Sequence, residues 1–315
     1  MAKNNSDNLS KGDIISFVAI ILLGVTVFFG MNFSTLGDKV PSIVVAILLV
    51  VVMTVFVFLA AHAKAQNRNQ SMWKNVEYAM LGLYVIALIP CYLYSAKFFD
   101  IYFSKTEITQ QVQSDLEGIN KMFSDYNRKC ESRCGSYQTT LETMMTYDQG
   151  RQKIAELLDM KPENVTKANV KQASESFMNS LKGGEYKALE SEKKNLETNV
   201  LTNFKNWNIL FIPQYASELG AAKSKYATEL KAIYYKHKNE IEKKVEEFDA
   251  TAYSSESTIT NTFSDLAGFS IMGLLAVLIF GGLGLVKYLK EEKRTVIDFK
   301  EGDSSVITSD GGFTF

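Results

Sequence analysis

The sequence predicts an all-α protein with four membrane-spanning helices and a helical bundle outside the membrane, between the third and fourth of them. Two observations lead to this prediction. The apolar residues gather in four uncharged blocks, and the long polar stretch between the last two blocks has a helical apolar period. The net charge of −1 supports no nucleic-acid partner, because such a partner requires a basic stripe.

The four blocks set the membrane part of the chain. They cover residues 14–33, 40–61, 78–96 and 266–286. A helix of about 20 apolar residues crosses the hydrocarbon core of a bilayer, whereas a buried core helix is shorter and is interrupted by polar positions. The first block is too long for the apolar part of a signal peptide and has no small-residue cleavage site after it, so we expect it to be retained.

The distribution of lysine and arginine predicts the orientation. Basic residues lie before the first block, between blocks two and three, and after block four (Lys3, Lys11, Lys64, Arg68, Lys74, Lys287, Lys290, Lys293 and Arg294). Positive charge favours the cytoplasmic side. Both termini are therefore expected in the cytoplasm, and the long segment between blocks three and four is expected outside. The expected parts are residues 1–96 with three spans, an extracytoplasmic domain 97–265, the fourth span 266–286 and a cytoplasmic tail 287–315.

The extracytoplasmic domain has the pattern of long helices. Apolar residues at steps of three and four predict one helix from about Ser104 to Gly150 and a second along Leu219–Ala252. Shorter helices are expected over 151–160, 163–181 and 185–206. Together they predict an antiparallel bundle or stalk whose outer helices continue the third and fourth spans.

The sequence offers no chemistry of an enzyme. It contains no glycine-rich phosphate loop, no nucleophile motif and no paired metal-binding histidines, and His62 and His237 lie far apart. We expect no enzymatic activity, no metal and no cofactor. The middle of each block lacks charge, which disfavours an ion-coupled transporter but leaves open a pore lined by small residues.

Block four carries small residues that allow helices in lipid to approach closely. They are Gly268, Gly273, Ala276, Gly281, Gly282 and Gly284. We expect them to pack against other helices of the same chain or of a second copy, so an oligomer is expected.

The tail has two readings. It is either disordered or a docking peptide for a cytoplasmic partner, held through Phe299, Phe313 and Phe315.

Cys130 and Cys134 lie four residues apart in the domain expected outside, where disulfides persist. Helix geometry directs such side chains poorly for a bond, but Gly135 is expected to loosen the helix there. A local disulfide and two unpaired thiols both stay open.

The hydropathy layout of nearly the whole chain resembles that of TssN. TssN is a membrane component of variant bacterial type VI secretion systems that lack the usual TssJ, TssL and TssM core. The layout is three helices from Ile14 to Ala96, a helical periplasmic region, Leu266–Val286 and a short tail. The resemblance implies an inner-membrane scaffold that joins a trans-envelope complex.

Three functions follow as hypotheses. The first is a non-enzymatic inner-membrane scaffold of an envelope-spanning assembly, as in protein secretion, with membrane and periplasmic proteins as partners. The second is a receptor whose outside bundle senses a ligand and signals through a partner. The third is a channel or transporter subunit.

Overall fold

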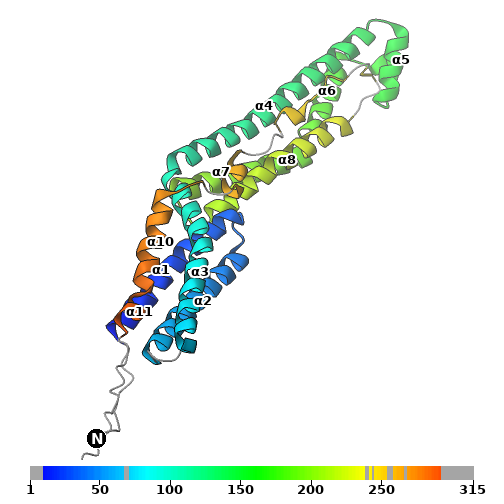
Figure 1. Ribbon diagram of the computed structural model, residues 1–315. Helices are drawn as coiled ribbons and strands as arrows, with labels where there is room; N and C mark the ends of the chain where they lie inside the picture. Colours follow the sequence, from blue (N-terminus) through cyan, green and yellow to red (C-terminus); the bar gives the residue numbers. More distant parts are fainter. Residues whose placement is uncertain are drawn as a thin grey trace, which may run out of the picture.

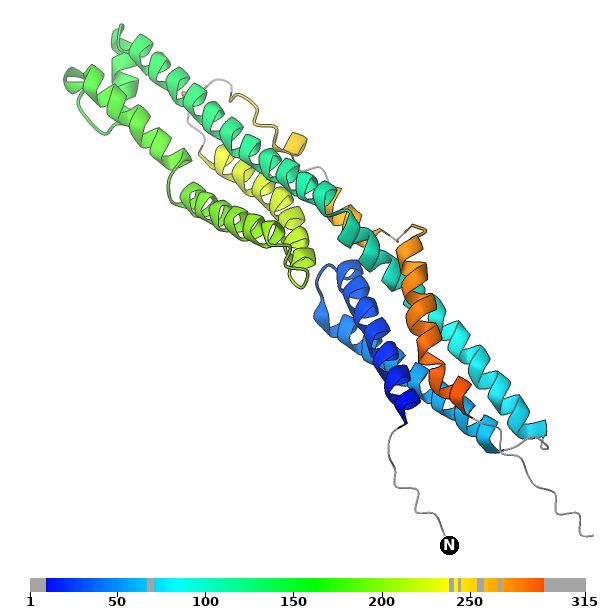
Figure 2. The same ribbon diagram turned by 90° about the vertical axis from the view of Figure 1, so that its left-hand side faces the viewer.

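The computed structural model describes residues 10–66, 71–237, 241–242, 245–253, 258–265 and 268–291. Within these residues the chain forms helices and no strand. The molecule is elongated, with one helix bundle at each end (Figure 1). The start of α1 and the last described helix, α11, lie at the same end (Figure 2).

The membrane bundle contains α1 (Lys11–Ser34), α2 (Lys39–Gln66), α3 (Ser71–Phe103), α10 (Ile271–Gly284) and the short α11 (Val286–Lys290). Four helical stretches are long and apolar enough to cross a membrane, which confirms the four predicted spans. Their common core includes Ile20, Leu23, Met53, Tyr84 and Val277.

The outer surface of this bundle is also apolar. Large hydrophobic side chains that are exposed there include Phe17 on α1, Ile47 on α2, Ile86 on α3 and Leu278 on α10. In water such a surface would aggregate, whereas in a bilayer it faces hydrocarbon. The chain is therefore built as a membrane protein.

The fourth span begins later than the sequence predicted. Residues 268–270 are not helical, and α10 starts at Ile271. The Ser270 hydroxyl accepts a hydrogen bond from the Gly273 N–H at 3.3 Å. This N-cap satisfies a backbone group that would otherwise have no partner, and it fixes the start of the helix.

The distal region, residues 105–265, continues outward from the membrane bundle. It is built from α4 (Lys105–Met144), α5 (Asp148–Leu157), the 3₁₀ turn η1 (Pro162–Asn164), α6 (Lys167–Leu181), α7 (Gly184–Lys205) and α8 (Ile212–Lys236). The turn η2 (Ala250–Tyr253) and α9 (Thr258–Ser264) follow. Helix α4 alone is about 60 Å long at ~1.5 Å per residue. Helices α6 and α7 return beside α4, and α8 runs outward again (Figure 2).

The end of α4 was predicted too far along the chain. It ends at Met144, and Gly150 lies inside α5. A Cβ atom at position 150 would lie 2.0 Å from the Met144 carbonyl oxygen. Gly150 therefore permits the close chain reversal at the tip of the molecule, and does not end the long helix.

The predicted helix along Leu219–Ala252 is wrong in its second half. Helix α8 ends at Lys236, and the described residues after it form a return segment (241–265) that leads back toward the membrane bundle. In this segment Phe248 is fully buried against Tyr126 and Tyr234. The apolar period that predicted a helix is thus satisfied by a chain that folds back onto α8 and α4.

Three of the contacts between the two regions involve Gly37, Phe33 and Lys97. Gly37, at a φ of 92°, lies so close to the backbone of Gln214 that a Cβ atom there would come within 2.8 Å of the Gln214 nitrogen. Phe33 packs on Phe263 at 5.7 Å between ring centroids. Lys97 of α3 donates to two backbone carbonyls at the end of α9. These contacts join the distal region to the membrane bundle by packing as well as by the chain.

Candidate functional site: a groove between two distal helices

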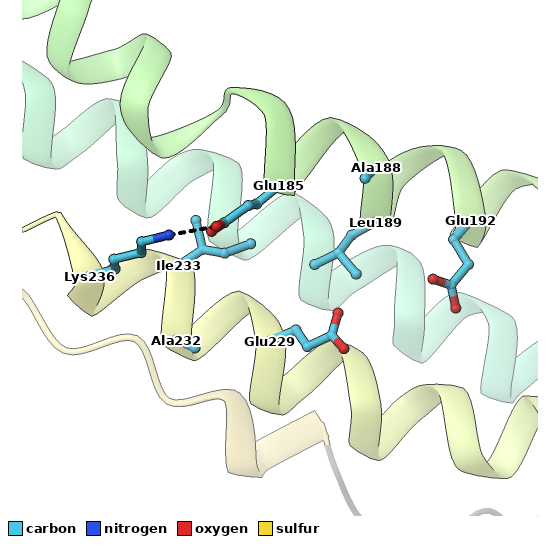
Figure 3. A pocket seen from close by; sticks show the side chains of 8 residues that line it. All are labelled: Glu185, Ala188, Leu189, Glu192, Glu229, Ala232, Ile233 and Lys236. Carbon is cyan, nitrogen blue, oxygen red and sulfur yellow. Dashed lines mark hydrogen bonds and ion pairs between the residues drawn. The ribbon is translucent and has the colours of Figure 1, made fainter.

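A surface groove follows the line where α7 and α8 pack together. Its outer part has a volume of about 500 Å³ and is lined by Glu185, Ala188, Leu189, Glu192, Glu229, Ala232, Ile233 and Lys236. Its inner part, about 410 Å³, shares Glu192 and continues to Tyr226. Leu189 and Ile233 are buried at its base, whereas Ala188 and Ala232 are exposed (Figure 3).

Two ion pairs cross this groove from α7 to α8. The Lys236 Nζ lies 2.5 Å from Glu185 Oε1, and the Lys225 Nζ lies 2.6 Å from Glu192 Oε1. All four side chains are about half exposed. The hydrogen bond from Lys236 lowers the pKa of the Glu185 carboxyl, and the bond to Glu192 raises the pKa of Lys225. Glutamate thus lies on α7 and lysine on α8 at two successive positions along the groove, that is, at two heights above the membrane bundle.

A buried hydroxyl lies at the inner part of the groove. Tyr226 is fully buried, and its hydroxyl has no hydrogen-bond partner among the described groups. Burial raises the pKa of this hydroxyl, and the neighbouring Glu192 carboxylate raises it further.

Sequence reasoning did not identify this groove. In the sequence, the glutamates and lysines of α7 and α8 have the pattern that is typical of the solvated face of a single helix. Only the pairing of α7 with α8 brings Glu185 to Lys236, 51 residues apart. The exposed alanines Ala188 and Ala232 were the one local signal, since small residues on a helix face permit a close neighbour.

Arg133 caps the end of α8, and sequence analysis did not identify this role either. Its guanidinium donates to the carbonyls of Tyr234 (2.5 Å) and His237 (2.6 Å), which the end of α8 leaves without helical partners. Arg133 Nε donates to Glu242 Oε1 at 2.7 Å, and Nη2, which also bonds the His237 carbonyl, donates to Glu242 Oε2 at 2.6 Å. The Arg133 and Glu242 side chains are 2% and 7% exposed. One arginine of α4 thus joins α8 to the return segment.

A second buried ion pair joins α8 to α4, nearer the membrane bundle. Lys223 Nζ on α8 lies 3.0 Å from Asp115 Oδ1 on α4, with both side chains largely buried. At the junction, Lys97 Nζ donates to Thr262 O (2.8 Å) and Asp265 O (2.6 Å). The first contact holds α8 against α4, and the second holds the end of α9 against α3.

Cys130 and Cys134 are free, buried thiols in the structure. Helix α4 continues through Gly135 without interruption, so the expected loosening of the helix does not occur. Cys134 Sγ lies 3.9 Å from Met178 Sδ on α6. Burial raises the pKa of Cys130 to about 11 and that of Cys134 to about 12. The geometry matches the second alternative, two unpaired thiols; the disulfide itself stays a prediction.

The small residues of block four fall into two groups. A Cβ atom would lie 2.6 Å from Ala96 Cα at Gly273, 2.9 Å from Leu88 Cδ2 at Gly281 and 2.4 Å from the Tyr84 hydroxyl at Gly284. Ala276 is buried with them. Gly282 and Gly268 have open space around the same position. The first group therefore packs against α3 and α1 of the same chain, and the second does not.

Other predicted features have simpler outcomes. Phe299, Phe313 and Phe315 lie outside the described residues. Within the described part of the chain, no group of three histidine, cysteine or carboxylate side chains gathers as metal ligands would.

Comparison with protein-family models, curated proteins and solved structures finds no match.

Proposed function

We propose that this chain is a non-enzymatic scaffold of the inner membrane, which holds the distal region in the periplasm as a docking rod for other proteins of an envelope-spanning assembly. One observation carries the proposal. The distal region bears an exposed, charged groove and is fixed to the membrane bundle by packed side chains as well as by the chain itself.

A scaffold needs stiffness between its anchor and its docking surface. Only Ser104 separates the end of α3 at Phe103 from the start of α4 at Lys105, and the core side chains of α4 are buried along nearly its whole length. The contacts of Lys97, Gly37 and Phe33 resist bending at this junction. A force on the groove would thus be transmitted to the membrane bundle.

Among envelope-spanning assemblies, we favour a protein secretion system. The layout of the chain resembles that of TssN, and the tail after α11 would lie in the cytoplasm, where a second contact is available. Native isolation of the tagged protein from bacterial membranes should then recover other envelope proteins. Isolation of this protein alone would contradict the proposal.

A receptor is the second candidate, and the return segment favours it. This segment is attached to the distal region by Arg133 and enters the membrane as α10, so a change at the distal end has a direct path to the fourth span. Replacement of residues 105–265 by an unrelated helical domain should abolish a ligand response. An unchanged response would exclude this candidate.

A further inference from the structure

The ion pairs of the groove have a pattern that a second copy of the chain can match. At both heights the acidic side chain belongs to α7 and the basic one to α8. These pairs are exposed, and an exposed pair is held only weakly by its own chain. Each charge is therefore free to exchange its partner for an equivalent one nearby.

We propose that the groove between α7 and α8 is the surface through which a second copy of this chain binds, side by side in the same membrane. The inference rests on the proposed scaffold function, because it names a partner for the surface of that scaffold. A dimer would present two anchored rods to the rest of the assembly.

The membrane limits how two copies can meet. Both are anchored by the same four helices, so the distal regions of both extend to the same side, and α8 runs outward in each. A symmetric pair uses one surface twice, about a two-fold axis. With the axis along the groove, α7 of one copy faces α8 of the other, and residues of equal height meet.

This arrangement brings opposite charges together. Glu192 on α7 would face Lys225 of the second copy, and Glu185 would face Lys236 of the second copy. The two-fold axis repeats each contact, so four ion pairs join the two chains. In an antiparallel, head-to-tail pair these opposite charges would not face each other. Two chains that are anchored in the same membrane from the same side do not form such a pair.

The side chains between the charges allow the helices to approach. Ala188 on α7 and the exposed Ala221 and Ala232 on α8 are small. Helix α7 is about 33 Å long, and two helices side by side are ~20 Å wide. The surface is thus about 650 Å² per copy, or ~1,300 Å² in total, which is enough for a specific interface.

Excess negative charge in the groove limits the affinity between the two copies. Besides the two ion pairs, Glu218 and Glu229 line the groove, so each copy brings two further carboxylates. Confinement of both copies to one membrane offsets this repulsion, because it raises their effective concentration.

A charge exchange between two variants tests the proposal. Glu192→Lys alone places lysine at positions 192 and 225, and Lys225→Glu alone places glutamate at both. Each variant should lose self-association by at least tenfold in a membrane or nanodisc, since like charges then meet. Mixed together, the two variants should associate with each other, because each contact of the mixed pair joins a lysine to a glutamate.

Cysteines at Ala188 of one variant and Ala232 of the other report the contact by cross-linking, since the native thiols are buried. The matched control is Lys182→Glu, which breaks the exposed pair with Glu131 outside the groove and should leave self-association unchanged. Circular dichroism confirms that each variant is folded.

The outcomes separate this inference from the scaffold function. If each single variant associates like the wild type, or if the folded mixture fails to associate, the second-copy contact is wrong. A monomeric wild-type protein that still co-purifies with other envelope proteins would overturn this inference and leave the scaffold intact. A dimer that recovers no other protein would support the contact and contradict the scaffold.

Discussion

Arg133 of α4 and Glu242 of the return segment form a two-point ion pair, almost out of contact with water, at the place where α8 ends. The same guanidinium serves the last carbonyls of α8, so it replaces the helical hydrogen bonds that an extension of α8 would have made. Removal of one buried partner leaves the other charge uncompensated, which is far more costly than removal of both.

The first prediction concerns this pair. Arg133→Met should lower the free energy of unfolding of the distal region by about 3–5 kcal/mol. The double variant Arg133→Met, Glu242→Met should recover part of that loss, because no unpaired charge remains. Denaturant unfolding followed by circular dichroism measures both. Arg128→Met is the control, since the Arg128–Asp125 pair is exposed, and it should change little. Equal effects of Arg128→Met and Arg133→Met would contradict the role of burial.

The second prediction concerns the two thiols of α4. Because burial raises their pKa values, almost no reactive thiolate forms at pH 8, and folded protein should resist maleimide. After unfolding without reductant, both Cys130 and Cys134 should react. A requirement for reductant before labelling would instead show the local disulfide.

The third prediction is a loss of stability in alkali. A group whose pKa is higher in the folded than in the unfolded protein contributes stability below its unfolded pKa, and this is lost as the pH rises toward the folded value. For Cys130 and Cys134 the window runs from about 9, their ordinary value, to about 11–12. The melting temperature should fall across this window, and Cys130→Ala should reduce the slope. A flat profile above pH 9 would contradict this.

The fourth prediction compares two glycines of α10. Gly273→Ala places a methyl group against the backbone of Ala96 and should destabilise the membrane bundle by roughly 1–3 kcal/mol. Gly282→Ala has open space and should be neutral or slightly stabilising. Thermal unfolding in detergent compares them. If the two variants behave alike, the packing of α10 on α3 differs from that described.

The fifth prediction concerns orientation. Ser191→Cys on α7 should react in intact cells with a maleimide that passes the outer but not the inner membrane. Gln66→Cys, at the end of α2, should react only after the inner membrane is opened. Both positions are exposed in the structure, so accessibility alone gives no difference. The reverse pattern would invert the topology.

How far the sequence predicted the fold depended on whether the cause was local. The four spans were predictable because the transfer of charge and backbone into lipid is costly at any position. Helix α4 was predictable because its apolar period persists over 40 residues. The end of α8 was not predictable, since the carbonyls at that end are bonded by Arg133, about a hundred residues away. The groove was not predictable either, because Glu192 and Lys225 come together only when α7 packs on α8.

The point at which α8 ends also bears on how the length of the molecule can evolve. Beyond Arg133, α4 packs mainly against α5 and α6, through Tyr137 and Leu141. A seven-residue insertion in α4, matched by one in α6, would lengthen this outer part by about 11 Å and leave the groove between α7 and α8 where it is. The length of the molecule beyond Arg133 can therefore change through α4, α5 and α6, while α7 and α8 keep the groove at a constant distance from the membrane bundle.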